Sequence, residues 1–124
     1  MISFLIWIAI SLFLGAAEAV YFYKTKNPPA NIHMYFTAMR VLILGGIFLF
    51  NRSYIDLLYP LVFTFFHDGM YYVVRDKLDH SYPLGWWSQS TTSTSFLDKL
   101  ELTTPILRTI SCVVGTALIV YLNN

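Results

Sequence analysis

The sequence predicts an all-α membrane protein in which four transmembrane helices form a small bundle and both termini face away from the cytoplasm. The chain is 56% hydrophobic and only 12% charged, with a mean hydropathy of +0.57, whereas about a quarter of the residues in soluble domains are charged. Four apolar stretches each come close to the ~17–25 residues that a spanning helix needs. Lysine and arginine concentrate on one side of the predicted topology. We therefore expect a single multi-pass membrane domain, residues 1–124, in a plasma or inner membrane.

The first apolar stretch, residues 2–23, is expected to be an uncleaved membrane anchor. The alternative is a secretory signal, because Ala17, Glu18 and Ala19 resemble a small-x-small cleavage site behind an apolar core. A signal peptide has a positively charged segment before that core. Here the first lysines follow the apolar stretch instead, which favours the anchor.

The second and third apolar stretches, residues 34–50 and 54–74, are expected to form a helical hairpin. Residues 51–53 make a tight polar break between them, so little backbone is left unpaired in lipid. Arg40 interrupts the second stretch. We expect a modest bend of the third helix at Pro60, because proline removes one backbone hydrogen bond from a helix.

The longest extramembrane segment is the predicted cytoplasmic loop, residues 76–104. At its start, Arg75 and Asp79 are spaced i,i+4, so their side chains can pair on one helix. Residues 88–95 are a Ser/Thr-rich tract of the kind that forms a flexible linker. Residues 96–102 alternate apolar and charged side chains, which fits a short amphipathic segment on the membrane surface.

The last apolar stretch, residues 105–122, carries a recognisable helix start. Thr103 or Thr104 can cap the helix with its hydroxyl oxygen. Pro105 suits the first helical position, where the backbone donor it lacks is not needed.

The orientation follows from the distribution of basic residues. In a four-span bundle the first and third loops share one side, and they hold most of the basic loop residues: Lys24, Lys26, Arg75, Lys77 and Lys99. The second loop has only Arg52, and the two termini have none. The positive-inside rule therefore places the first and third loops in the cytoplasm.

Ionisable residues from all four stretches fall in one layer near the predicted cytoplasmic face: Glu18, Arg40, His67, Asp68 and Arg108. At about 1.5 Å of rise per residue, each lies ~5–10 Å from the cytoplasmic end of its stretch. Charges removed from water are costly unless they are paired. We therefore expect a closed network between the helices. Tyr72 and Arg75 share a helical face with Asp68 and belong to the same candidate site.

Small residues one turn apart predict two close contacts between helices. One pair is Gly15 with Ala19 in the first stretch, and the other is Ser111 with Gly115 in the last. Such pairs let two helix backbones approach within a membrane.

Composition and motifs exclude several classes of function. The net charge is +1 without a basic tract, so nucleic acid is not an expected partner. Cys112 is the only cysteine, which excludes an intrachain disulfide. We find no Walker, GxGxxG, HExxH or EF-hand pattern. We expect neither a metal nor a cofactor, because no histidine has an i,i+4 histidine partner among the candidate ligands Glu18, His33, His67, Asp68 and His80.

Three hypotheses for function remain open. The first is a non-catalytic subunit or accessory protein whose charge layer holds the bundle together, with the lipid bilayer and a second copy or another membrane protein as partners. The second is a proton- or ion-coupled transporter or channel that uses intramembrane carboxylates and histidine. In size, predicted helix number and the carboxylate Glu18 of its first helix, the chain is similar to small multidrug transporters; no further motif extends that similarity.

The third hypothesis is an enzyme acting at the level of the lipid headgroups. His67 would be its general base, Asp68 or Glu18 would orient that base, and Arg40 or Arg108 would hold a phosphate or carboxylate. Against it, consecutive helix positions point ~100° apart, so we do not expect His67 and Asp68 to serve one another. We place the non-catalytic hypothesis first.

Overall fold

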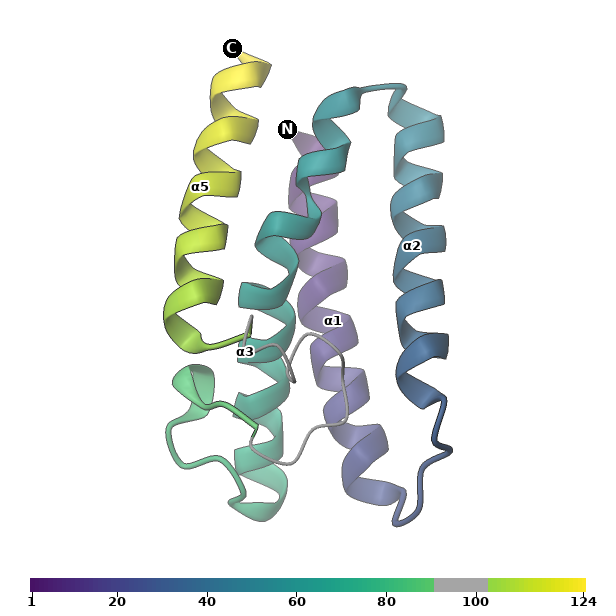
Figure 1. Ribbon diagram of the computed structural model, residues 1–124, viewed down its shortest axis with the longest axis vertical. Helices are drawn as coiled ribbons and strands as arrows, with labels where there is room; N and C mark the ends of the chain where they lie inside the picture. The colour runs from purple at the N-terminus through teal and green to yellow at the C-terminus, as the bar shows by residue number, and fades with distance from the viewer. Residues whose placement is uncertain (91–102) are drawn as a thin grey trace.

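The computed structural model describes residues 1–90 and 103–124, and every regular element within them is helical. In chain order these are α1 (Ile2–Lys24), α2 (Ile32–Asn51), the short 3₁₀ helix η1 (Tyr54–Leu58), α3 (Pro60–Asp79), the 3₁₀ helix η2 (Gly85–Trp87) and α5 (Pro105–Asn123). The four long helices run side by side, with both chain termini at one end of the bundle (Figure 1). We call this the terminal end, and we call the opposite end, which holds residues 25–31 and His80, the loop end.

Among the described residues, three helices are long and apolar enough to cross a membrane, namely α1, α2 and α5. The all-helical prediction and the membrane-protein composition are therefore confirmed to that extent. α3 has a comparable length of 20 residues, but His67, Asp68 and the charged turns near its C-terminus lower its mean hydropathy. It falls outside the group of three for that reason.

The hairpin break after the second apolar stretch lies where the sequence predicted it. α2 ends at Asn51, and Arg52 adopts the left-handed conformation, with φ 52°. The Ser53 hydroxyl then accepts a hydrogen bond from the backbone N–H of Ile55, at 3.3 Å, at the start of η1.

The predicted bend within the third helix is wrong, because Pro60 begins α3 and does not lie inside it. Residues 54–58 form the separate helix η1. The backbone carbonyl of Asp56 accepts a hydrogen bond from the N–H of Tyr59 at 3.1 Å, so the missing proline donor leaves no gap in the pairing. Proline is common at the first position of a helix for this reason.

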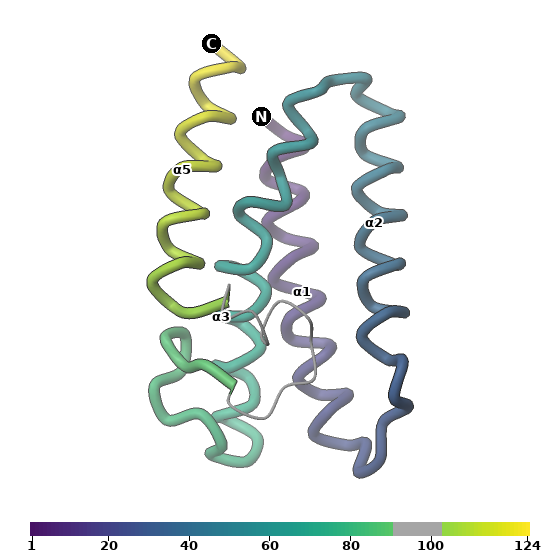
Figure 2. Tube along the Cα trace, in the orientation of Figure 1, coloured from purple at the N-terminus to yellow at the C-terminus, as the bar shows by residue number. Residues whose placement is uncertain are grey.

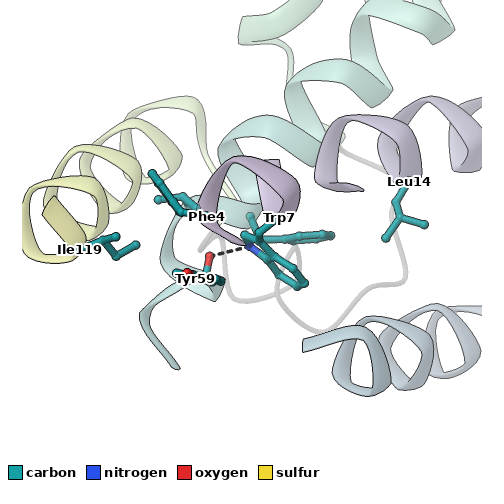
Figure 3. Packing of buried hydrophobic residues seen from close by; sticks show 7 residues of the cluster. Phe4, Trp7, Leu14, Tyr59 and Ile119 are labelled. Atoms are coloured by element: carbon teal, nitrogen blue, oxygen red, sulfur yellow. Dashed lines mark hydrogen bonds between the residues drawn. The ribbon is translucent and has the colours of Figure 1, made fainter. Parts of the chain in front are cut away.

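The apolar core joins α1, η1, α3 and α5. Its buried members are Phe4, Trp7, Leu14, Tyr59, Val62, Phe63 and Ile119. Figure 3 shows Trp7 at the centre of this cluster, where its indole N–H donates a hydrogen bond of 2.9 Å to the backbone carbonyl of Tyr59. The hydrogen bond satisfies the only polar atom of a buried indole and ties α1 to the start of α3.

Glycines allow α3 to approach its two neighbours closely, as the small-residue pairs predicted. A Cβ built on Gly15 of α1 would lie 2.2 Å from the backbone oxygen of His67, and one on Gly115 of α5 would lie 2.7 Å from the Cβ of Leu61. The Ser111 hydroxyl also donates a hydrogen bond of 2.6 Å to the Leu61 carbonyl. α3 is therefore the central helix, with α1 and α5 packed on it.

Helix α2 stands beside this unit and contributes no buried residue. Figure 2 shows its trace running alongside the bundle, connected by residues 25–31 at one end and by residues 52–53 at the other. Ile43, Leu44 and Ile47 pack against the core from their partly buried positions. The remaining faces of α2 are largely exposed.

The predicted start of the last helix is confirmed. Thr104 is the N-cap of α5, and its hydroxyl oxygen accepts a hydrogen bond of 3.4 Å from the backbone N–H of Leu107. Pro105 takes the first position. The expected amphipathic segment, residues 96–102, and most of the expected linker, residues 91–95, lie outside the described residues.

Candidate functional site

The site begins with the close approach of α1 to α3. Because Gly15 has no side chain, the α1 backbone lies against the backbone of His67. Glu18, almost one turn further along α1, then reaches the imidazole ring: its Oε2 lies 3.1 Å from Nε2 of His67. Both residues are buried, each with 5% of its surface exposed.

Asp68 contacts the other nitrogen of the same ring, with 2.7 Å between its Oδ1 and Nδ1 of His67. Our expectation that these consecutive residues could not serve one another is wrong. The ~100° step between neighbouring helix positions describes the directions of the Cα–Cβ bonds. Nδ1 lies beyond Cβ, so side-chain torsions can turn it toward the next carboxylate.

Arg40 brings α2 to the cluster. Its Nη2 donates to Oε1 of Glu18 and lies 3.1 Å from Nε2 of His67. The guanidinium also lies over the ring of Phe63, 4.9 Å from the ring centroid. Phe63 in turn stacks on His67 at 4.7 Å between centroids. We call Glu18, Arg40, His67 and Asp68 the polar cluster.

Both ring nitrogens of His67 are in contact with other side chains of the polar cluster. Nδ1 of His67 faces Asp68, and Nε2 faces Glu18 and Arg40. With His67 protonated, the cluster contains two cations and two anions, which is the balance that a site removed from water favours. Because the two carboxylates sit on opposite nitrogens, they do not converge on one point. Within the described residues no group of three potential ligands could hold a metal ion.

Arg108 lies elsewhere. It is 1% exposed, and its Nη2 donates two hydrogen bonds, each of 3.0 Å, to the backbone carbonyls of Trp86 and Ser88. Its guanidinium lies over the ring of Tyr72, 5.4 Å from the centroid. The structure therefore brings four of the five predicted layer residues together, while the described hydrogen bonds of Arg108 join α5 to the segment around η2.

Sequence reasoning missed η2 as a partner for Arg108. The ring of Trp86 packs against the backbone of α3, so that a Cβ built on Gly69 would lie 2.1 Å from it. Gly85, with φ +55°, turns the chain into this position. Gly69, whose missing side chain leaves room for the Trp86 ring, was the available signal in the sequence.

Tyr72 and Arg75, the two further candidates on the face of Asp68, lie toward the loop end. The Tyr72 hydroxyl accepts a hydrogen bond of 3.0 Å from the backbone N–H of Ser90. Arg75 forms the predicted i,i+4 pair with Asp79, at 2.7 Å, and also donates to the Tyr71 hydroxyl at 3.2 Å. Hydrogen bonds from Ser81 and from Arg75 hold the pKa of Asp79 below its usual value.

Two other histidines were candidate ligands. His33 stacks on Phe22, with 5.6 Å between ring centroids. His80 adopts the left-handed conformation that ends α3. These contacts give each of them a structural role in the described part of the chain.

A cavity of about 620 Å³ is lined mainly by residues of α1, α2 and α3, and also by Ser90 and Thr103. The polar cluster forms part of its wall. Toward the terminal end the wall is apolar and includes Trp7, Val41, Leu44 and Phe63. Toward the loop end it is polar and includes Lys26, His33, Tyr71, Arg75 and Tyr82. We call this cavity the α2 cleft.

Taken alone, this geometry shows a partly buried cluster of two carboxylates, an arginine and a histidine beside a cavity with one apolar and one polar end. Comparison of the chain with protein families, curated proteins and solved structures returned no match.

Proposed function

We propose that this chain is a non-catalytic integral membrane protein with four spans and both termini outside the cytoplasm, in which the polar cluster clamps α2 onto the α1/α3 pair. Three helices of sufficient length and hydropathy support the membrane assignment. α3 would be the fourth span, since its buried polar residues face neighbouring helices and not lipid. Both termini lie at one end of the bundle, as four passes require (Figure 1). The concentration of lysine and arginine in the loops at the other end supports the orientation.

The observation that supports the proposal most strongly is that both ring nitrogens of His67 are already in contact with charged side chains. A general base needs a lone pair within reach of a substrate proton, yet both ring nitrogens already lie within 3.1 Å of Glu18, Asp68 or Arg40. Glu18 likewise has both carboxylate oxygens engaged, one by Arg40 and one by His67. This saturation favours a structural clamp over the catalytic and ion-binding alternatives.

In this proposal, the clamp holds α2 against the α1/α3 pair. None of the residues of this helix is fully buried, and its apolar contacts with the core come from the partly buried Ile43, Leu44 and Ile47, whereas burial of apolar side chains is the usual source of helix docking. Arg40 supplies an ion pair with Glu18 and a cation–π contact with Phe63. Removing one partner of a buried ion pair leaves an uncompensated charge and costs about 3–5 kcal/mol.

A double-mutant cycle on Glu18 and Arg40 tests the clamp. Arg40→Met keeps the apolar stem over Phe63 while it removes the charge, and Glu18→Gln removes the partner charge. We expect Arg40→Met to lower the free energy of unfolding in detergent by about 3 kcal/mol, since Arg40 is 24% exposed. The coupling energy between the two changes should be at least about 1 kcal/mol.

Arg52→Met is the matched control, because Arg52 is an exposed cation just after α2. It should leave the free energy of unfolding nearly unchanged. Strictly additive effects of Glu18→Gln and Arg40→Met, or losses no larger than that of the control, would show that the cluster does not hold α2.

A further inference from the structure

We propose that the α2 cleft binds one anionic lipid molecule, with an acyl chain along its apolar section and the phosphate group at its basic mouth. This goes beyond the clamp, which explains how α2 is held but not what fills the space beside it.

The cleft has the length that an acyl chain requires. Its lining residues on α3 run from Pro60 to Arg75, which is ~22 Å at 1.5 Å per residue. A single leaflet contributes about half of the ~30 Å hydrocarbon core. A chain and its headgroup would therefore fit along the helix axis. The volume of about 620 Å³ is also within the ~300–1,000 Å³ typical of small-molecule sites.

The apolar section includes one side chain that the described part of the chain leaves largely uncovered. Val41 lines the cleft and is 63% exposed. Leu44 and Trp7 line the same section from the two opposite sides, on α2 and α1. Protein interiors are close-packed, so we expect the apolar section of a cavity of this size to be filled by an apolar group.

The mouth of the cleft favours an anion. Among the described residues, the wall holds two carboxylates, Glu18 and Asp68, and both already accept from Arg40 or His67. Of the remaining lining charges, Lys26 is exposed in a connection, residues 25–31, that contains no acidic residue.

Arg75, Tyr71 and Tyr82 complete the lining of the mouth. Asp79, which pairs with Arg75, does not line the cleft, and the Tyr71 hydroxyl accepts a hydrogen bond from Arg75. Charge-assisted hydrogen bonds from lysine and arginine are the strong contacts of phosphate recognition. A phosphate at this level would lie at the loop end, where the basic loop residues gather.

The experiment is a lipid titration of the full chain in mild detergent, read by native mass spectrometry. The probes are phosphatidylglycerol and phosphatidylcholine with identical acyl chains, and inorganic phosphate alone. Two pairs of variants separate the sections of the cleft. Val41→Trp fills the apolar section, and Leu42→Trp is its control, because Leu42 is 76% exposed and does not line the cleft. Lys26→Gln removes a mouth charge, and Lys77→Gln removes an exposed lysine outside the lining.

We expect one phosphatidylglycerol per chain, bound in preference to phosphatidylcholine. Val41→Trp should lower phosphatidylglycerol binding at least tenfold, while Leu42→Trp leaves it unchanged. Lys26→Gln should lower the preference for the anionic lipid about fivefold, as expected for one basic residue near a phosphate. Lys77→Gln should not change the preference for the anionic lipid.

Four results would overturn the proposal. These are no lipid adduct on the wild-type chain, equal binding of the two lipids, equal effects of Val41→Trp and Leu42→Trp, and saturation by inorganic phosphate without lipid. Lys26→Gln changes an exposed loop side chain, so its result stands even if Val41→Trp fails to fold. None of these outcomes depends on the coupling between Glu18 and Arg40, so the clamp and the lipid site can fail separately.

Discussion

Gly15→Ala is the sharpest test of how α1 is positioned on α3. The added Cβ would lie 2.2 Å from the backbone oxygen of His67, about 1.2 Å short of the 3.4 Å at which ordinary contact begins. The obstructing atom belongs to the backbone of a central helix, so it cannot swing aside as a flexible side chain could. Either the two helices separate or the contact remains strained.

The size of the effect can be isolated with a matched variant. Alanine is better than glycine in a helix by about 1 kcal/mol, and this gain applies equally to Gly46→Ala, where a new Cβ meets nothing within 4 Å. The difference between the two variants therefore reports overpacking alone, which costs about 1–3 kcal/mol. We expect Gly15→Ala to be less stable than Gly46→Ala by that amount in equilibrium unfolding in mixed micelles.

The same change should also weaken the polar cluster. A helix shift of about 1.2 Å would extend the 3.1 Å contact between Glu18 and His67 beyond hydrogen-bond reach. Glu18→Gln should therefore cost less stability in the Gly15→Ala background than in the wild type. If Gly15→Ala were as stable as Gly46→Ala, the close contact of α1 with α3 would be refuted.

Two further predictions concern α3: its packing against η2 and its charged end at the loop end of the bundle. Gly69→Ala would place a Cβ 2.1 Å from the ring of Trp86, so we expect a loss of about 1–3 kcal/mol and a shift in tryptophan emission; unchanged emission would contradict this packing. Because its folded-state pKa is lowered, Asp79 stabilises the fold above its unfolded pKa of about 3.9, and this contribution is lost as the pH falls through the lower folded value. The wild type should therefore melt higher than Asp79→Asn at pH 7, and the gap should close in strong acid; a gap that persists there would exclude Asp79 as its source.

Local signals in the sequence determined where most helices begin and end. The predicted stretches 2–23, 34–50 and 105–122 agree within two residues at each end with α1, α2 and α5. Apolar runs, threonine caps and prolines act through neighbouring residues, so they can be interpreted without knowing the fold. The prediction for the third stretch failed because Pro60 suits both a bend and a helix start, and the structure shows the second.

The depth of each polar residue could also be predicted, but the identity of its partner could not. Rise per residue places Glu18, Arg40 and His67 at similar depths. Which of them meet depends on helix rotation and on the distance between axes, and both are decided by remote contacts such as Gly15 against the backbone of α3. Arg108 shows the same limit, because its acceptors are backbone carbonyls, which every residue carries and no sequence pattern marks.

The sequence by itself therefore determined a helical protein with helices long and apolar enough to cross a membrane. Only the tertiary structure decided that four of the predicted layer residues close on one another, that Arg108 binds the segment around η2, and that α2 stands apart behind a cavity. The physical reason is the distance along the chain over which the two kinds of interaction act. Helix formation and hydropathy are local properties, whereas the separation of α2 from α3 is a balance of contacts between residues far apart in the chain.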